Sequence, residues 1–298
     1  MVRIVSLLPS TTEILFAVGA GDDVVGVTFE CDYPTEARTR RIVSTTALGS
    51  GLTAAQIDAE VRARVAAGED LYTLDEGALR DLDPDLVVTQ DLCAVCAVDV
   101  ANVDQALDHL GCRADVITVD PMTLEEVLTS IVTLGKATGN VDEAEALVES
   151  LKARLDRVAT AVQDRDRPRV AMLEWTDPLF SGGHWVPDMV AAAGATSVLG
   201  AGGQRSRQID WFDLTDSTPD VIVVAPCGYN LDGAVELATA LLRGGCLPAG
   251  AELWAVDANA AFVRPGPRLV DGIEALAAIA HPDALNSRPD LARRIDTT

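Results

Sequence analysis

The sequence has few aromatic residues and few histidines, and it has no long apolar run. Aromatic side chains make up 4% of its 298 residues, and three residues are histidine. No segment approaches the roughly 18 consecutive apolar residues of a membrane-spanning helix, so we expect no direct insertion into a membrane. The Gly-x-Ser-x-Gly elbow, the Gly-Lys-Ser phosphate loop and the His-Glu-x-x-His motif are also missing. None of these three enzyme signatures therefore supports a catalytic assignment.

Basic residues are scarce as well. The chain has 23 Lys and Arg against 46 Asp and Glu, which leaves a net charge of -23 at pH 7. Nucleic acids and anionic membranes attract clustered positive charge, so we expect no nucleic-acid partner. The first residues, Met1-Val-Arg-Ile-Val-Ser, run directly into a strand-like segment with no secretion signal. This predicts a cytoplasmic protein, or a periplasmic or extracellular one if a leader has been removed.

Short apolar runs alternate with segments of helical period, which is typical of parallel strands joined by crossover helices. We predict an α/β fold of two Rossmann-like lobes, residues 1–121 and 167–298, with a long connecting helix over 122–166 and a ligand cleft between the lobes. The helical segment from Thr123 to Gln163 is interrupted at Gly135, Gly139 and Asn140, so two ordinary crossover helices are the alternative. The expected strands are Val2–Leu7, Val24–Thr28, Leu86–Thr89, Val116–Val119, Val170–Leu173, Val221–Ala225 and Leu253–Val256.

The two predicted lobes share a sequence pattern. Leu82-Asp-Pro-Asp-Leu-Val-Val in the first half parallels Ser217-Thr-Pro-Asp-Val-Ile-Val in the second. In each case Pro-Asp closes a helix and opens a buried strand. We expect both halves to be built on the same plan.

Four of the six cysteines follow predicted strands. Ligands of open parallel sheets bind at the carboxyl ends of the strands, where Cys31, Cys93, Cys96 and Cys227 are expected. Thiolates favour zinc, iron or an iron–sulfur cluster, so these four are candidate metal ligands. A redox pair at Cys93-Ala-Val-Cys96 and unrelated buried thiols are the alternatives. Cys112 and Cys246 follow glycine ahead of an expected strand, and we expect both in the core.

Other polar and aromatic residues follow strands of the second half. Glu174 and Trp175 come after Val170–Leu173, and His184 and Trp185 follow a glycine pair that would form a flexible loop. A capping role for His184 is the alternative to ligand binding. The turn Arg264-Pro-Gly-Pro-Arg268 and the pair Ser206-Arg207 suit an anionic group, although salt bridges are the commoner use of Arg. The candidate ligand-binding residues are Glu174, Trp175, His184, Trp185, Arg207 and Arg264.

Three segments of the chain carry a family resemblance. They are Arg3-Ile-Val-Ser-Leu-Leu-Pro-Ser near the start, Asp177-Pro-Leu-Phe-Ser-Gly-Gly in the middle and Arg264-Pro-Gly-Pro-Arg near the end. They resemble the cobalamin and iron-siderophore binding proteins of ABC importers over nearly the whole chain. The resemblance implies two lobes joined by a long helix and a ligand such as a corrinoid (cobalamin), another metal chelate or a metal ion. The chain is similar to a cytosolic, cysteine-containing branch of that family.

Two departures limit what the resemblance implies. Family members that dock on a transporter place a Glu seven residues before each Pro-Asp, where this chain has Gly77 and Phe212 beside Glu76 and Asp213. The resemblance therefore does not imply that this chain docks on a transporter. Cobalamin binders also present an aromatic residue where this chain has Thr46 and Ala47. The alternative function is a cytosolic thiolate-metal or iron–sulfur enzyme, with Glu174 or His184 as acid or base.

Overall fold

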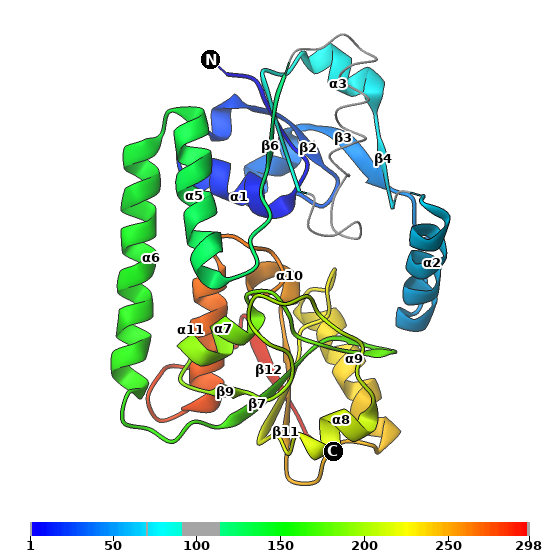
Figure 1. Ribbon diagram of the computed structural model, residues 1–298, viewed down its shortest axis with the longest axis vertical. Helices are drawn as coiled ribbons and strands as arrows, with labels where there is room; N and C mark the ends of the chain where they lie inside the picture. Colours follow the sequence, from blue (N-terminus) through cyan, green and yellow to red (C-terminus); the bar gives the residue numbers. More distant parts are fainter. Residues whose placement is uncertain (1, 70, 91–113, 297–298) are drawn as a thin grey trace. The chain divides into compact units, whose positions relative to one another are not determined.

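The computed structural model describes residues 2–69, 71–90 and 114–296, and it divides into two compact units (Figure 1). The first unit comprises residues 1–121 and 128–148, and the second comprises 122–127 and 149–298. Each unit has its own sheet and its own hydrophobic core. The placing of domain boundaries at 121 and 166 stays a prediction.

The sheet of the first unit has the strand order β4-β3-β2-β1-β5-β6. Its strands are parallel except β4, which runs antiparallel to β3. Val and Ile dominate the central strands because both faces of a parallel sheet are covered. The described elements are β1 (Ile4–Ser6), α1 (Pro9–Ala17), a 3-10 turn (Gly21–Asp23), β2 (Val24–Thr28), a second 3-10 turn (Thr35–Thr39), β3 (Arg41–Thr46), α2 (Ala54–Ala67), β4 (Tyr72–Leu74), α3 (Glu76–Leu82), β5 (Leu86–Thr89), β6 (Asp115–Thr118) and most of α5 (Leu124–Thr138).

The sheet of the second unit has the order β12-β11-β10-β7-β8, and β9 pairs with β7. The central strands β7, β10 and β11 are parallel, whereas β8 and β12 run antiparallel at the two ends of this order. The remaining elements are α6 (Val141–Val162), β7 (Arg169–Thr176), β8 (Leu179–Ser181), α7 (Val186–Ala192), β9 (Thr196–Ser197), α8 (Trp211–Asp216), β10 (Val221–Val224), α9 (Leu231–Gly244), β11 (Glu252–Val256), α10 (Ala258–Ala261), α11 (Leu269–Ala280) and β12 (Ala292–Ile295).

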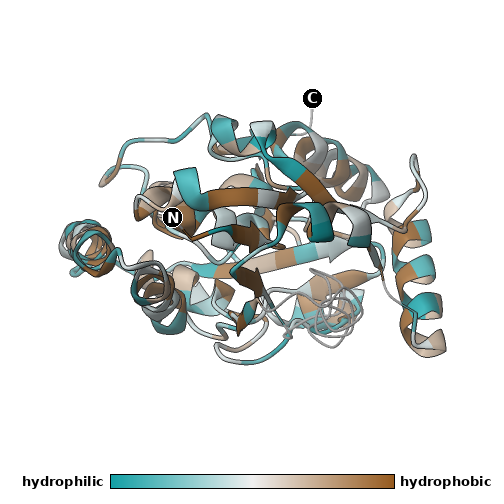
Figure 2. Ribbon diagram, turned by 90° about the horizontal axis from the view of Figure 1, so that it is seen from above, coloured by the Kyte–Doolittle hydropathy of each residue, from teal (hydrophilic) through white to brown (hydrophobic). Residues whose placement is uncertain are grey.

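Each core forms where a helix covers one face of a sheet. In the first unit, Leu79 of α3 packs with Val5, Val43 and Val87 of three adjoining strands. In the second, α9 packs on the face formed by β7, β10 and β11. Figure 2 shows the hydrophobic colour concentrated in the strands, while the helices carry both colours, as helices with one apolar stripe do. Among the described helices, none is both long and apolar enough to cross a lipid bilayer.

The segment from Thr123 to Gln163 forms two helices instead of one. The helix α5 ends at Thr138 because Gly139 adopts a left-handed conformation (φ 77°) and the Asn140 amide donates to the Gly135 carbonyl (2.8 Å). The long connecting helix is therefore α6 alone. Its residues up to Val148 count with the first unit and the rest with the second.

The repeated sequence pattern corresponds to a repeated structure. In the first unit, the Arg3 amide donates to the Asp85 carboxylate (2.8 Å), and in the second unit the Arg169 amide donates to Asp220 (2.8 Å). Each arginine side chain also donates to a backbone carbonyl in the turn before its partner aspartate. The same contacts are thus found in both units, at the amino ends of paired central strands. The prediction that both halves share a plan is confirmed.

Candidate functional site

The candidate site of the second unit is built around Glu174, which lies near the carboxyl end of β7. Its carboxylate accepts hydrogen bonds from the Gly183 amide (2.9 Å) and from the Ser206 hydroxyl. A Cβ atom at Gly183 would collide with the backbone of Ser206, so glycine is required there for close approach and not for flexibility. Glu174 therefore holds two loops together at this edge of the sheet.

An aromatic pair lies at the same edge. Trp175 and Tyr229 contact each other edge to face, with ring centroids 5.9 Å apart. Trp175 donates from its indole to the Asp177 carbonyl (3.1 Å), and partial burial raises the pKa of Tyr229. Since β7 and β10 are neighbours, Tyr229, which follows β10, comes beside Trp175. Both side chains are half-buried.

His184 has an unusual backbone and side-chain environment. It adopts φ 51°, in the left-handed region, and its ring lies 5.6 Å from that of Trp185. Its Nε2 atom is buried with no hydrogen-bond partner. Burial lowers the pKa of the imidazole, and the nearby Arg205 charge lowers it further, which favours the neutral ring. A neutral imidazole nitrogen is an acceptor or a metal ligand.

The other sequence candidates of this unit lie in different surroundings. Trp185 is buried and donates to the Phe262 carbonyl (2.8 Å), as a core residue does. Arg207 has a side chain that is 59% exposed and lies 3.9 Å from Asp213. Arg264 is half-buried in the turn before α11. Their ligand-binding roles stay predictions, and Arg207 is the most exposed of the three.

The cysteines do not form a metal centre among the described residues. Cys31 is buried in the first unit beside Thr12, with 3.1 Å between sulfur and hydroxyl oxygen, and Cys227 is exposed in the second. Cys93, Cys96 and Cys112 lie outside the described residues. Within the part of the chain that the structure describes, no three His, Cys, Asp or Glu side chains are grouped to hold a metal. The four-cysteine site stays a prediction.

The core position predicted for Cys246 is wrong, because this thiol is exposed. The helix α9 ends at Gly244, and Gly245 caps it in the left-handed conformation (φ 69°). Cys246 therefore begins a surface loop, and β11 starts only at Glu252.

Sequence reasoning missed Tyr229, the partner of Trp175 at this edge. Tyr229 follows Pro226-Cys-Gly after β10, so its position after a strand could have singled it out.

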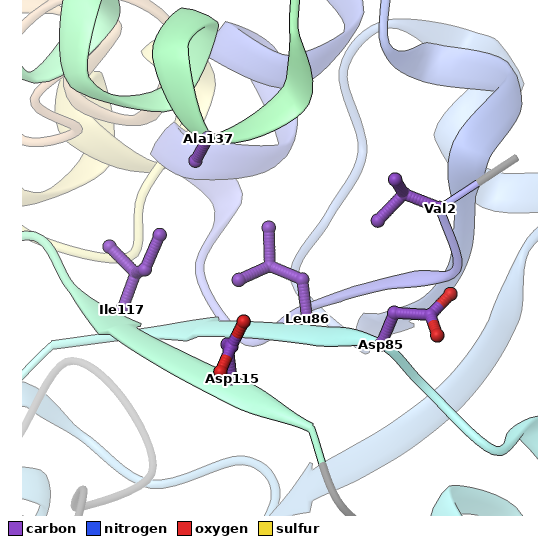
Figure 3. Close-up of a pocket in the computed structure, with 6 residues that line it drawn as sticks. All are labelled: Val2, Asp85, Leu86, Asp115, Ile117 and Ala137. Carbon is purple, nitrogen blue, oxygen red and sulfur yellow. The ribbon is translucent and has the colours of Figure 1, made fainter.

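A cavity of about 530 Å³ lies elsewhere in the first unit (Figure 3). Figure 3 shows Asp85 and Asp115 near the amino ends of β5 and β6, with Leu86, Ile117, Val2 and Ala137 around the hollow. Asp85 is already engaged by the Arg3 amide. None of the predicted site residues that the structure describes lines this cavity.

Comparison with known proteins decides the family. Residues 4–239 match the family described as periplasmic binding protein. The chain belongs to this family. A substrate-binding lipoprotein of an ABC transporter from Bacillus subtilis is 28% identical over 94% of this chain and 80% of its own length. A vitamin B12-binding protein from Yersinia pestis is 24% identical over 77% of this chain and 71% of its own.

Solved structures of periplasmic binding proteins share the fold. A haem-binding protein from Pseudomonas aeruginosa aligns with a TM-score of 0.69 at 23% identity, covering 99% of this chain and 98% of its own. The vitamin B12 binding protein of Vibrio cholerae aligns with a TM-score of 0.63 at 20% identity, covering 93% and 95%. The family resemblance and the α/β fold class are confirmed.

The predicted cytoplasmic location is wrong. The matching family consists of periplasmic binding proteins, and the Bacillus subtilis relative is a lipoprotein. The prediction depended on the first residues of the printed sequence, which say nothing of what precedes them in the natural protein.

Proposed function

We propose that this chain is the substrate-binding protein of an ABC importer and that its ligand is a planar metal chelate, either a corrinoid such as cobalamin or a haem. A relative that binds vitamin B12 and a protein of the same fold that binds haem support this ligand class. Both molecules combine a flat apolar ring system with polar side groups.

The observation that carries the proposal is the Trp175–Tyr229 pair at the carboxyl edge of the second sheet. Aromatic side chains supply a flat apolar surface, which suits the ring system of a corrin or a porphyrin. The largely exposed Arg207 guanidinium suits an anionic side group, such as a haem propionate or the cobalamin phosphate. Glu174 contributes by holding the loops on either side of this surface.

A direct binding measurement tests the proposal. Purified protein is titrated with cyanocobalamin, haem and a ferric siderophore, and binding is followed by absorbance and equilibrium dialysis. We expect saturable binding of cyanocobalamin or haem. Trp175→Ala should weaken that binding about tenfold or more, because the lost apolar contact is worth at least ~1.4 kcal/mol.

Trp211→Ala is the matched control, since Trp211 is also partly exposed but belongs to α8. Its affinity should equal that of the unmodified protein. Failure of both cyanocobalamin and haem to bind would contradict the proposal.

Docking through two matched glutamates is not part of the proposal. Gly77 and Phe212 occupy the positions that the family resemblance associates with docking. Beside them, Asp213 accepts a hydrogen bond from the Asp210 amide (3.2 Å) in a capping box, while Glu76 is exposed in the first turn of α3. The two units therefore differ at these positions.

A further inference from the structure

We infer that helix α2 of the first unit is a self-association surface, through which two copies of this chain form an antiparallel helix pair. The helix carries an apolar stripe of Ile57, Val61 and Val65. These residues are four apart, so they share one face of the helix. Val65 is 50% exposed, and the other two are half-buried. The inference goes beyond the proposed function and does not depend on it.

The stripe is not covered by a neighbouring element of the described chain. Figure 1 shows α2 set apart from the sheet of its own unit and joined to it by the loops before and after the helix. No other described helix or strand packs along α2, and only Ala54 in its first turn is buried. Isolated helices of this length are marginal in water and depend on packing of their apolar face. The stripe is therefore a surface for a second molecule.

Local contacts hold α2 in helical form before any partner binds. The Gln56 amide donates to the Thr53 hydroxyl (3.3 Å), and the Thr53 amide donates back to the Gln56 side chain (2.9 Å), which closes a capping box. Gly68 ends the helix in the left-handed conformation (φ 68°). The Arg64 side chain donates to the Ala47 carbonyl in the preceding loop (3.1 Å). A preformed helix loses little freedom on pairing, so less of the contact energy is lost to ordering.

The charges beside the stripe select a second copy of the chain as the partner. One flank carries Asp58 and Arg62, 2.8 Å apart, and the other flank carries Glu60 and Arg64, 3.4 Å apart. A two-fold axis at Val61 makes each flank face the same flank of the second copy in reverse order. Asp58 then faces Arg62 of the second copy, and Glu60 faces Arg64. Opposite charges therefore meet on both sides of the apolar stripe.

Other arrangements fit this surface less well. A parallel pair would make one flank face the other and would bring Asp58 close to Glu60 of the second copy. Nucleic acids and anionic membranes are disfavoured by the net charge of -23. A helix of 14 residues is about 20 Å long, so the buried area lies at the low end for protein interfaces. We therefore expect a weak dimer that forms as the protein concentration rises.

Sedimentation velocity from micromolar to millimolar protein tests the inference, in about 0.15 M sodium chloride to screen the repulsion between acidic chains. The average mass of the unmodified protein should rise from monomer towards dimer. Val61→Glu places two carboxylates at the two-fold axis and should weaken dimerisation about tenfold or more. Glutamate is a good helix former, so circular dichroism should stay unchanged.

Ala59→Glu is the matched control. Ala59 is exposed on the opposite face of α2, so the variant adds the same charge to the same helix outside the stripe. It should dimerise like the unmodified protein. An equal loss in both glutamate variants would mean that added charge, and not the stripe, controls association, and the inference would be wrong.

A charge exchange tests the antiparallel arrangement. Asp58→Arg and Arg62→Glu each place like charges on one flank and should each weaken dimerisation about fivefold. An equimolar mixture of the two variants should recover the affinity, because each copy then faces opposite charges. A mixture that associates no better than either variant alone would contradict the inference. An unmodified protein that stays monomeric at millimolar concentration, or a dimer that survives Val61→Glu, would also overturn it.

Discussion

At the scale of single residues, His184 combines a strained backbone with a buried, unpaired ring nitrogen. It has a left-handed backbone, a buried Nε2 without a hydrogen bond, and a lowered pKa caused first by burial. A histidine with a lowered pKa binds its proton more weakly in the folded state than in the unfolded state. The folded protein is therefore stabilised above the unfolded pKa, and this stabilisation is lost as the pH falls below it.

We predict that His184→Asn removes one pH-dependent step of stability. In the unmodified protein, the free energy of unfolding should decrease from about pH 6.5, the ordinary histidine pKa, down to the lower folded value. Asparagine tolerates the left-handed backbone, so the variant should fold and lack this step. Urea unfolding between about pH 5 and 8 measures the difference. Parallel pH curves for the two proteins would show that His184 titrates as it does when unfolded.

Position near the end of a strand could be predicted for some candidate residues, but their burial could not. Glu174 and Trp175 lie near the carboxyl end of β7 as the sequence predicts, because a residue that ends a buried strand lies at the sheet edge whatever its partners are. The sequence did not separate Trp185, whose indole donates to the Phe262 carbonyl in the core, from an exposed tryptophan.

At the scale of elements, one arginine joins the connecting helix to the second unit. Arg154 of α6 donates to Glu274 (2.7 and 2.9 Å) and to Asp271 (2.6 Å) of α11. The hydrogen bonds to Glu274 contribute most to raising the pKa of the guanidinium, and the hydrogen bond to Asp271 raises it further. Arg288 adds its charge to the same two carboxylates. The side chains are about three-quarters buried, so solvent screens these pairs only in part.

We predict that Arg154→Met lowers the free energy of unfolding by about 1–3 kcal/mol, because charged hydrogen bonds are lost while the apolar stem is kept. Urea unfolding measures this change. Arg157→Met is the control, since Arg157 is exposed on the same helix. An equal loss in both variants would assign the effect to helix charge instead of the Glu274 contact.

The strands that could be predicted are the buried ones. The predicted bounds of β2 and β5 agree with the structure, because short segments rich in Val and Leu are typical of strands covered on both faces. The strand β12 was missed because Ala-Arg-Arg-Ile is polar, as suits the end of a sheet, and β8 and β9 are too short for any period to show. The sequence could not decide between one long helix and two, because the backbone angle of Gly139 is known only from the structure.

At the scale of the whole molecule, the acidic charge is the dominant feature. Half of the 46 acidic residues have no basic counterpart in the composition, so the folded chain carries strong self-repulsion. The two units and their common plan were predictable, since a repeated pattern such as Pro-Asp before a strand can be recognised in the sequence without knowing how the chain packs. The location was not, because no internal residue pattern records the compartment.

We predict that salt stabilises the folded protein. Raising the ionic strength from 0.01 M to 0.15 M shortens the screening distance from about 30 Å to about 8 Å, which weakens repulsion among the acidic residues. Thermal midpoints measured in sodium chloride and in potassium chloride should rise together. A midpoint that falls with salt would mean that attractive pairs such as Arg154–Glu274 outweigh the repulsion.

All four tryptophans, Trp175, Trp185, Trp211 and Trp254, belong to the second unit. Their fluorescence therefore reports on that unit alone, while far-ultraviolet circular dichroism records the helices and strands of both. Because Trp185 is buried and Trp175 lies at the candidate site, the same emission responds to unfolding of the core and to a light-absorbing ligand at the sheet edge. Agreement or disagreement between the two optical signals reveals whether the units unfold as one cooperative body.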